Sequence, residues 1–363
     1  LFLFLAVLGL SGLALGSARF PLAEVIAVFT GGGDPTVRLI VLQLRLPRVA
    51  GAVLAGVGLA VSGLLLQSAT GNDLCSPNII GVNSGAGFAV MVLLCLFPMA
   101  FAVLPLAAFA GALFTTFLVL GISVGAGGHQ SKSTVLLAGV AVSSLLSAGI
   151  SFLSQLVPDA LASYSAFSIG GFSGVQGADL VFPALMIGVG TGLAWGLAPQ
   201  LNLLCLGDEL AATLGVKVKA LRLICLILAS ALCAAVVTYA GLLGFVGLIV
   251  PHLARKLAGH DLRILVPVTA LLGANLVVLS DLAGRTLFSP AELPAGILMA
   301  LLGAPRALRV PISRVRSVTE TSMMFITPMP PTTSEMPAMT AMAMETVSSM
   351  LLIWETMVSM LMV

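Results

Sequence analysis

The chain is poor in charged residues: Asp, Glu, Lys and Arg together make up 8% of its 363 residues, where a soluble globular domain has roughly 25%. Hydrophobic residues make up 59% of the chain, against about 45–50% in an average soluble domain. This balance excludes an ordinary soluble fold and is typical of a membrane protein. The formal net charge of +2 says little about partners, and we expect no nucleic acid among them.

The sequence also lacks the usual signatures of a catalytic or metal site. Its five cysteines are scattered without a C-x-x-C pair, which indicates neither a disulfide framework nor a zinc site, and its three histidines are not spaced as metal ligands. No Walker A sequence occurs, because the nearest stretch, "GAGGHQSKST" (125–134), lacks the glycine before Lys132. No nucleophile, base and acid stand out as a set. We therefore expect no enzymatic activity, no cofactor and no bound metal.

Long apolar runs recur along the chain. A bilayer core of about 30 Å needs on the order of 20 apolar residues per helical span, whereas a β-barrel would show short alternating segments. We predict an all-α polytopic membrane protein with about ten transmembrane helices. The first run could be the apolar part of a signal peptide, but we interpret it as a span because so much of the chain is membrane-embedded. The predicted spans are 1–18, 46–67, 79–97, 103–122, 134–157, 180–198, 221–242, a short one at 246–257, 264–281 and 294–305.

The basic residues divide between the two faces of the predicted bundle. Alternating the spans gives one face that is richer in Lys and Arg, which the positive-inside rule assigns to the cytoplasm. Arg45, Arg48 and Arg285 fall on the opposite face, and Asp281 lies one helical turn before Arg285. We interpret the three arginines as exposed charges that lack local acidic partners and suit a negatively charged visitor. Anchoring to lipid headgroups is the alternative.

Polar segments interrupt the apolar runs at two informative places. The segment "GNDLCSPNIIGVNSGAG" (71–87) carries four glycines between two aliphatic runs. In "LNLLCLGDELAATLGVKVKALR" (201–222), Asp208 and Glu209 open a short helix whose positive end they complement, and Gly215 closes it. A solvated loop helix without further function is the alternative for the second segment.

The character of the chain changes after residue 305. Residues 323–362 hold eleven of the fifteen methionines among Thr, Ser, Pro and Glu. This composition is typical of a low-complexity segment or of a shifted reading frame. We therefore predict a transmembrane domain over 1–305 and an atypical tail over 306–363.

Eight motifs occur in the order in which one known family has them. They are "LRLPR" (44–48), "SGLLLQ" (62–67), "NDLCSPNIIGVNSGAG" (72–87), "LLAGVAVS" (136–143), "IGGFSG" (169–174), "LGDELAATLGV" (206–216), "GFVGLIVPHLAR" (244–255) and "AELPAGI" (291–297). Over residues 1–305 the chain thereby resembles the permeases of ABC importers that take up iron–siderophore complexes, haem and cobalamin.

The resemblance implies a type II importer permease of ten spans in the bacterial inner membrane. It also implies a second copy of the chain or a homologous permease around one translocation path. Two cytoplasmic ATPase subunits and an external substrate-binding protein would complete the complex, with membrane lipid around it.

The resemblance further implies three sets of site residues. The first closes the path at its cytoplasmic end, the second receives the ATPase, and the third pairs with carboxylates on the binding protein. Asp73 stands where the family usually has Pro, and Lys132 is unexpected in its loop. The gate residues are Asn72, Leu74, Ser131, Lys132 and Ser133; the coupling residues are Gly207, Asp208, Glu209, Ala211, Leu214 and Gly215; the docking residues are Arg45, Arg48 and Arg285.

We therefore predict a permease subunit of an ATP-driven importer for a metal chelate, with an iron–siderophore complex as the expected cargo. A secondary transporter or channel for a small solute is the alternative. It would place ionisable residues at mid-membrane, whereas here they cluster at span ends. A membrane-embedded enzyme ranks third, because no catalytic set is present.

Overall fold

The described structure is helical throughout, with no strand in the residues that the computed structural model describes, 1–16, 20–32, 34–125, 132–287 and 292–308. A π-helix, Ile40–Arg45, and two 3₁₀ turns, Phe101–Val103 and Ala178–Leu180, accompany the α-helices. The α-helices are α1 (Phe2–Ala14), α2 (Leu22–Phe29), α3 (Pro35–Leu39), α4 (Leu46–Thr70), α5 (Val82–Leu96), α6 (Leu104–Gly125), α7 (Lys132–Leu156), α8 (Pro158–Ile169), α9 (Val181–Gly196), α10 (Ala198–Cys205), α11 (Asp208–Thr213), α12 (Val218–Ala240), α13 (Val246–Ala258), α14 (Leu262–Thr286) and α15 (Ala295–Leu308).

Each predicted span coincides with one of these helices, and the all-α membrane class is confirmed. Six helical stretches are long and apolar enough to cross a membrane, and α1 and α5 are shorter apolar helices. The predicted short span is α13, with 13 residues. The six long stretches are Pro35–Thr70, Phe101–Ser123, Thr134–Leu156, Ala178–Gly196, Val218–Ala240 and Leu262–Thr286.

The second span is longer than its predicted range of 46–67. The helical stretch runs for 36 residues from Pro35, because a π-helix joins α3 to α4 without a break. Asp34 caps its start, where its Oδ1 accepts a hydrogen bond of 2.7 Å from the Thr36 amide. That bond holds the pKa of the Asp34 carboxyl below its ordinary value. The predicted range begins directly after Arg45, a residue that the pattern of charges assigns to the face opposite the cytoplasm.

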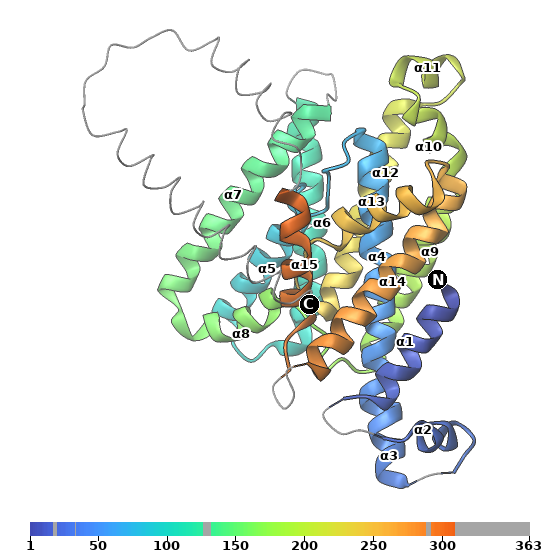
Figure 1. Cartoon of the computed structure of the whole chain (residues 1–363). Helices are drawn as coiled ribbons and strands as arrows, with labels where there is room; N and C mark the ends of the chain where they lie inside the picture. The colour runs from blue at the N-terminus through green and yellow to red at the C-terminus, as the bar shows by residue number, and fades with distance from the viewer. Residues whose placement is uncertain (17–19, 33, 126–131, 288–291, 309–363) are drawn as a thin grey trace, which may run out of the picture. The chain divides into compact units, whose positions relative to one another are not determined.

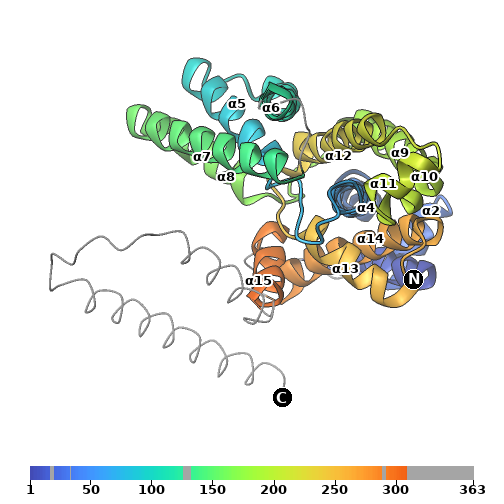
Figure 2. The same cartoon turned by 90° about the horizontal axis from the view of Figure 1, so that it is seen from above.

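Helix α4 lies at the centre of one group of helices, surrounded by α9, α12, α13 and α14 (Figure 2). An apolar segment of 18 residues within the helical stretch Pro35–Thr70, which includes α4, is 78% buried inside the protein. Glycines make this packing possible, because the backbone of α4 meets α14 at Gly56 and Gly273 and meets α13 at Gly63 and Gly247. A Cβ atom on Gly63 would overlap the Gly247 carbonyl.

Helices α5, α6, α7 and α8 form a second group (Figure 2). Helix α12 connects the groups, since it packs against both α4 and α6. Helix α7 is the most exposed of the six long stretches, because only 22% of an apolar segment of 18 residues within it is buried inside the protein. A helix this exposed within one chain is expected to face lipid, another subunit or a water-filled path.

The helices and loops that carry the predicted site residues lie at the two ends of the bundle in Figure 1. We call the end that carries α10, α11 and the start of α12 the α11 end. We call the opposite end, where α2, α3 and the last turn of α14 lie, the α2 end. Helix α4 runs from the α2 end to the α11 end, so the loop that follows it, residues 71–81, lies at the α11 end.

Candidate functional site

Helix α11 carries the predicted coupling residues at the α11 end. Gly207, with φ of 119°, and Gly215, with φ of 86°, bracket it in conformations that favour glycine. Asp208 and Glu209 lie in its first turn, where a carboxylate complements the positive end of the helix. An open hollow of about 660 Å³ lies against α11; its lining residues are Leu206, Gly207, Asp208, Glu209, Leu210 and Thr213.

The apolar side chains of α11 divide between the protein interior and its outside. Ala211 is buried, and it fixes one face of the short helix against the rest of the chain. Leu210, and Leu206 and Leu214 on either side of the helix, are at least half exposed. Short helices with exposed leucines beside carboxylates are suited to contact with another protein.

A buried arginine ties α11 to the end of α4. Arg222, near the start of α12, donates from Nη2 to both Asp208 carboxylate oxygens, at 3.0 and 2.9 Å. Its Nε donates to the Ala69 carbonyl at 2.9 Å. The guanidinium therefore links three helices, α12, α11 and α4.

A second tether joins α10 to the start of α14. The Asn202 side chain donates to Asp261 Oδ1 at 2.7 Å and accepts from the Leu262 amide at 2.9 Å. Asp261 also caps α14 by accepting from the Arg263 amide at 3.0 Å. The hydrogen bond from the Arg263 amide, and then the one from Asn202, hold the pKa of Asp261 below its ordinary value. The carboxylate is thus ionised at neutral pH.

The loop after α4 carries two of the predicted gate residues. Gly71 ends α4 in the left-handed conformation. Asn72 Oδ1 then accepts a hydrogen bond of 3.0 Å from the Leu74 amide, which folds the loop into an Asx turn. The Leu74 side chain is 51% exposed. Asn72 and Leu74 thus lie in a loop at one end of the helices, and their gating role stays a prediction.

An ion pair holds this loop to α13. Asp73 lies 3.1 Å from Arg255 Nη1, and the same nitrogen donates to Gln67 Oε1 at 2.7 Å. Gln67 in turn donates from Nε2 to the Gly247 carbonyl at 3.2 Å. Asp73, which departs from the family pattern, therefore has a partner in this chain.

The structure describes only part of the other predicted gate residues, which are Ser131, Lys132 and Ser133. Ser131 lies outside the described residues. Lys132 and Ser133 begin α7, and their side chains lie outside the described set.

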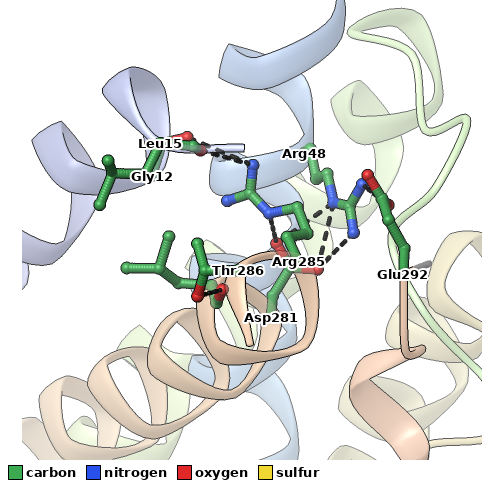
Figure 3. Close-up of polar contacts among 8 residues, drawn as sticks. Gly12, Leu15, Arg48, Asp281, Arg285, Thr286 and Glu292 are labelled. Carbon is green, nitrogen blue, oxygen red and sulfur yellow. Dashed lines mark hydrogen bonds and ion pairs between the residues drawn. The ribbon is translucent and has the colours of Figure 1, made fainter. Parts of the chain in front are cut away.

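The α2 end holds a cluster of charged residues around Asp281 (Figure 3). Arg48 contacts both carboxylate oxygens of Asp281, with Nη2 at 3.0 Å from Oδ1 and Nε at 3.2 Å from Oδ2. Its Nη1 donates to Glu292 Oε2 at 2.7 Å. Arg285 Nε lies 3.1 Å from Asp281 Oδ2, as an ion pair whose geometry falls outside that of a hydrogen bond. One buried carboxylate therefore serves two guanidiniums.

Two arginines also cap the end of α1, whose last turn has no basic residue. Arg45 Nη1 donates to the carbonyls of Leu13 and Ala14, at 2.7 and 2.9 Å. Arg285 Nη1 donates to the Gly12 carbonyl at 3.3 Å and the Leu15 carbonyl at 3.5 Å. The last carbonyls of a helix lack partners within it and form its negative end. Arginines from the π-helix and from α14 satisfy them here.

The expectation that the three arginines are exposed is wrong, and two of them, Arg48 and Arg285, have acidic partners. Arg45 and Arg285 are 6% and 3% exposed, and the Arg48 side chain is 13% exposed. Their partners are Asp281, Glu292 and carbonyls of α1, and most of these are far away in sequence. Direct docking of a partner protein by these side chains stays a prediction that no contact in the structure tests.

Sequence analysis missed several of these polar contacts. It noted Asp281 beside Arg285 but not Glu292, and it did not single out Arg222. A signal was available for Arg222, since an arginine next to an apolar span must find an acceptor. Among the described residues, no group of three or more His, Cys, Asp and Glu side chains could hold a metal ion.

The chain matches the model of the FecCD transport family over residues 3–309. It is 35% identical over 302 residues to the Fe(3+)-citrate import system permease protein YfmE of Bacillus subtilis, covering 83% of this chain and 90% of that protein. It is 39% identical over 273 residues to the hemin transport system permease protein HmuU of Yersinia pestis, covering 73% and 80%. A solved structure of an inward-facing ABC transporter of metal-chelate type matches with a TM-score of 0.76 and 33% identity, covering 84% of this chain and 94% of that one.

Proposed function

We infer that this chain, which belongs to the FecCD transport family, imports an iron–siderophore complex as the permease subunit of an ABC importer. It is a multi-pass membrane protein, and its relatives are permease subunits for iron chelates and haem. We place it in the bacterial inner membrane, with the α11 end in the cytoplasm. We assign ATP hydrolysis to partner subunits, and an iron–siderophore complex is preferred over haem or cobalamin as the cargo.

The observation that carries this proposal is α11. It exposes Leu210, with the exposed Leu206 and Leu214 on either side of the helix, beside an open hollow, and Arg222 ties it to α12 and α4. A surface helix that transmits movement from one subunit to another must be firmly attached to the helices that move. We propose that this helix receives one of two cytoplasmic ATPase subunits through the coupling residues, Gly207, Asp208, Glu209, Ala211, Leu214 and Gly215.

The proposed path lies along α7. Ser144, Ser147, Ser151 and Gln155 are exposed and share one face of this helix. Ser151 donates its hydroxyl to the Ser147 carbonyl at 3.1 Å, which leaves oxygen lone pairs for water or a polar cargo. A polar face on so exposed a helix supports a path shared with a second copy of the chain or a homologous permease.

We propose a gate and a docking surface at opposite ends of this path. Asn72 and Leu74, with Ser131, Lys132 and Ser133, would close the path at the α11 end. An external substrate-binding protein would dock at the α2 end. At that end, Arg45, Arg48 and Arg285 would hold the helices in position, and exposed residues around them would contact the binding protein.

Charge reversal on α11 tests the proposal. Replacing Glu209 by Lys should lower substrate-stimulated ATP hydrolysis in the reconstituted complex by at least about tenfold, equivalent to about 1.4 kcal/mol. Glu209 is exposed, so the new charge opposes both the docked ATPase and the positive end of α11. The measurement is ATP hydrolysis with and without loaded binding protein in nanodiscs.

Asp159 provides the matched control. It is an exposed acidic residue in the first turn of α8, and α8 lies away from α11 (Figure 1). Asp159→Lys should leave stimulation unchanged. Equal stimulation of the Glu209→Lys complex and the parent would remove α11 from the ATPase contact. Uptake driven by an ion gradient without ATP would favour the secondary transporter.

A further inference from the structure

The side chain of Arg222 connects α11 to the last turn of α4 through hydrogen bonds to both helices. The guanidinium is 4% exposed. Its Nη2 contacts Asp208 on α11, and its Nε contacts the Ala69 carbonyl of α4. The planar fork of an arginine can bond in two fixed directions at once, which a lysine ammonium cannot reproduce. The two contacts are therefore held at a set separation.

The contact to α4 lies close to the loop that follows it. Ala69 is one residue before the last residue of α4, and only Thr70 and Gly71 separate it from Asn72. Its carbonyl belongs to the last turn, where helix carbonyls lack intrahelical partners. A displaced guanidinium would take this carbonyl with it or leave it without a partner inside the protein, which is costly. A shift of α11 is thus passed to the end of α4.

Arg255 holds the same end of α4 from another side. It contacts Gln67 of α4 and Asp73 of the loop, and it comes from α13, not from α11. Two arginines therefore hold the end of α4, and of these two it is Arg222, from α12, that has a described contact to α11. This difference separates a connection to α11 from general support of the loop.

We propose that Arg222 is a positioning residue that carries a displacement of α11 to the end of α4 and so to the loop 71–81. The inference rests on the proposed function, in which α11 receives the ATPase. Asp208 supplies the contact on α11, and Ala69 supplies the contact on α4. Loss of Arg222 uncouples the loop from the ATPase while both remain in place.

The test compares uptake with ATP hydrolysis in proteoliposomes that contain the full complex and loaded binding protein. In Arg222→Lys and Arg222→Gln, uptake per ATP hydrolysed should fall by about 2- to 30-fold, the range typical of residues that carry coupling. The rate of ATP hydrolysis should stay within about twofold of the parent, since the ATPase contact itself is intact. A merely structural role would lower the rates of uptake and of ATP hydrolysis together through loss of folded protein, and would leave uptake per ATP near the parent value.

Asp208→Asn provides a variant that does not depend on a buried substitution, because the Asp208 side chain is 43% exposed. It should lower uptake per ATP as well. The double variant Asp208→Asn with Arg222→Gln should be no worse than Arg222→Gln alone, because both changes break one connection. Asn202→Ala is the control: it releases the tether between α10 and α14 without touching α4, and it should keep uptake per ATP near the parent value.

A distance measurement provides a second readout. Spin labels at Leu74 and Thr213, both exposed, should keep a constant separation between nucleotide states in the parent and show a broader distribution in Arg222→Gln. The background replaces Cys95 and Cys205 by serine, since the other three cysteines are buried.

The outcomes separate this inference from the proposed function. Parent-level uptake per ATP in both Arg222→Lys and Asp208→Asn, or an equal loss in Asn202→Ala, would overturn the role of Arg222. Absence of ATP-dependent uptake by the parent complex would overturn the proposed function itself.

Discussion

Asp281→Asn should destabilise the protein by about 3–5 kcal/mol, the cost typical of removing one partner from a buried ion pair. Asp281 is 2% exposed and faces both Arg48 and Arg285. Asparagine preserves the shape but removes the charge, so the buried guanidinium of Arg285 and the partly buried one of Arg48 lose their shared counterion. Arg285 depends on it most, because its Nε and Nη2 have no hydrogen-bond partner among the described residues.

The measurement is the midpoint of thermal unfolding in nanodiscs, together with protease access to α1, which Arg285 also holds. Glu292→Gln is the matched control. Its side chain is 36% exposed, so this change should cost below about 1 kcal/mol. Adding Arg48→Gln to Asp281→Asn should cost less than the sum of the two single changes, because one unpaired charge is removed. Equal midpoints for Asp281→Asn and Glu292→Gln would show that the cluster is solvated in the membrane.

Gly63→Val should abolish the native packing of α4 against α13, and Gly63→Ala should destabilise the protein by about 1–3 kcal/mol or more. An added Cβ would overlap the backbone carbonyl of Gly247. No flexible side chain can move aside there, so the two helices must separate. Because Gln67 and Arg255 bridge the same helices, the loop at 71–81 should loosen as well.

Gly121→Ala is the control for this pair of variants. An added Cβ on Gly121, in α6, meets no atom within 4 Å, and alanine is favoured over glycine within a helix by about 0.5–1 kcal/mol. Its unfolding midpoint should equal or exceed that of the parent. The yield of monodisperse protein in detergent gives the first comparison, and thermal unfolding gives the second. An unchanged midpoint for Gly63→Ala would mean that α4 and α13 are further apart than in this structure.

The sequence predicted the helices well because hydropathy is a local property. Each apolar run had enough length to reveal a span, even where α13 is short. The missed stretch, Pro35–Arg45, contains Arg38 and Arg45, and charges of this kind normally mark the end of a span. Arg45 lies inside the helical stretch because the carbonyls of α1 provide its partners.

The candidate sites divide in the same way. Helix α11 could be placed from local signals, namely the glycines at its two ends and the acidic residues of its first turn. The arrangement of the arginines could not, because their partners are distant in sequence. Arg48 and Asp281 are 233 residues apart, and Arg222 and Ala69 are 153 apart. Spacing along a chain carries no information on such pairs.

The capping of α1 has a consequence for the order in which the chain assembles during translation. Arg285, which donates to the carbonyls of Gly12 and Leu15, lies 273 and 270 residues after them. A ribosome therefore releases α1 into the membrane long before α14 exists. Arg45, which donates to the neighbouring carbonyls of Leu13 and Ala14, is made early, whereas the carbonyls of Gly12 and Leu15 lack the donor that α14 provides and are best satisfied near the aqueous headgroups until then. We therefore expect helix α1 to reach its final depth in the bilayer late, after the insertion of α14.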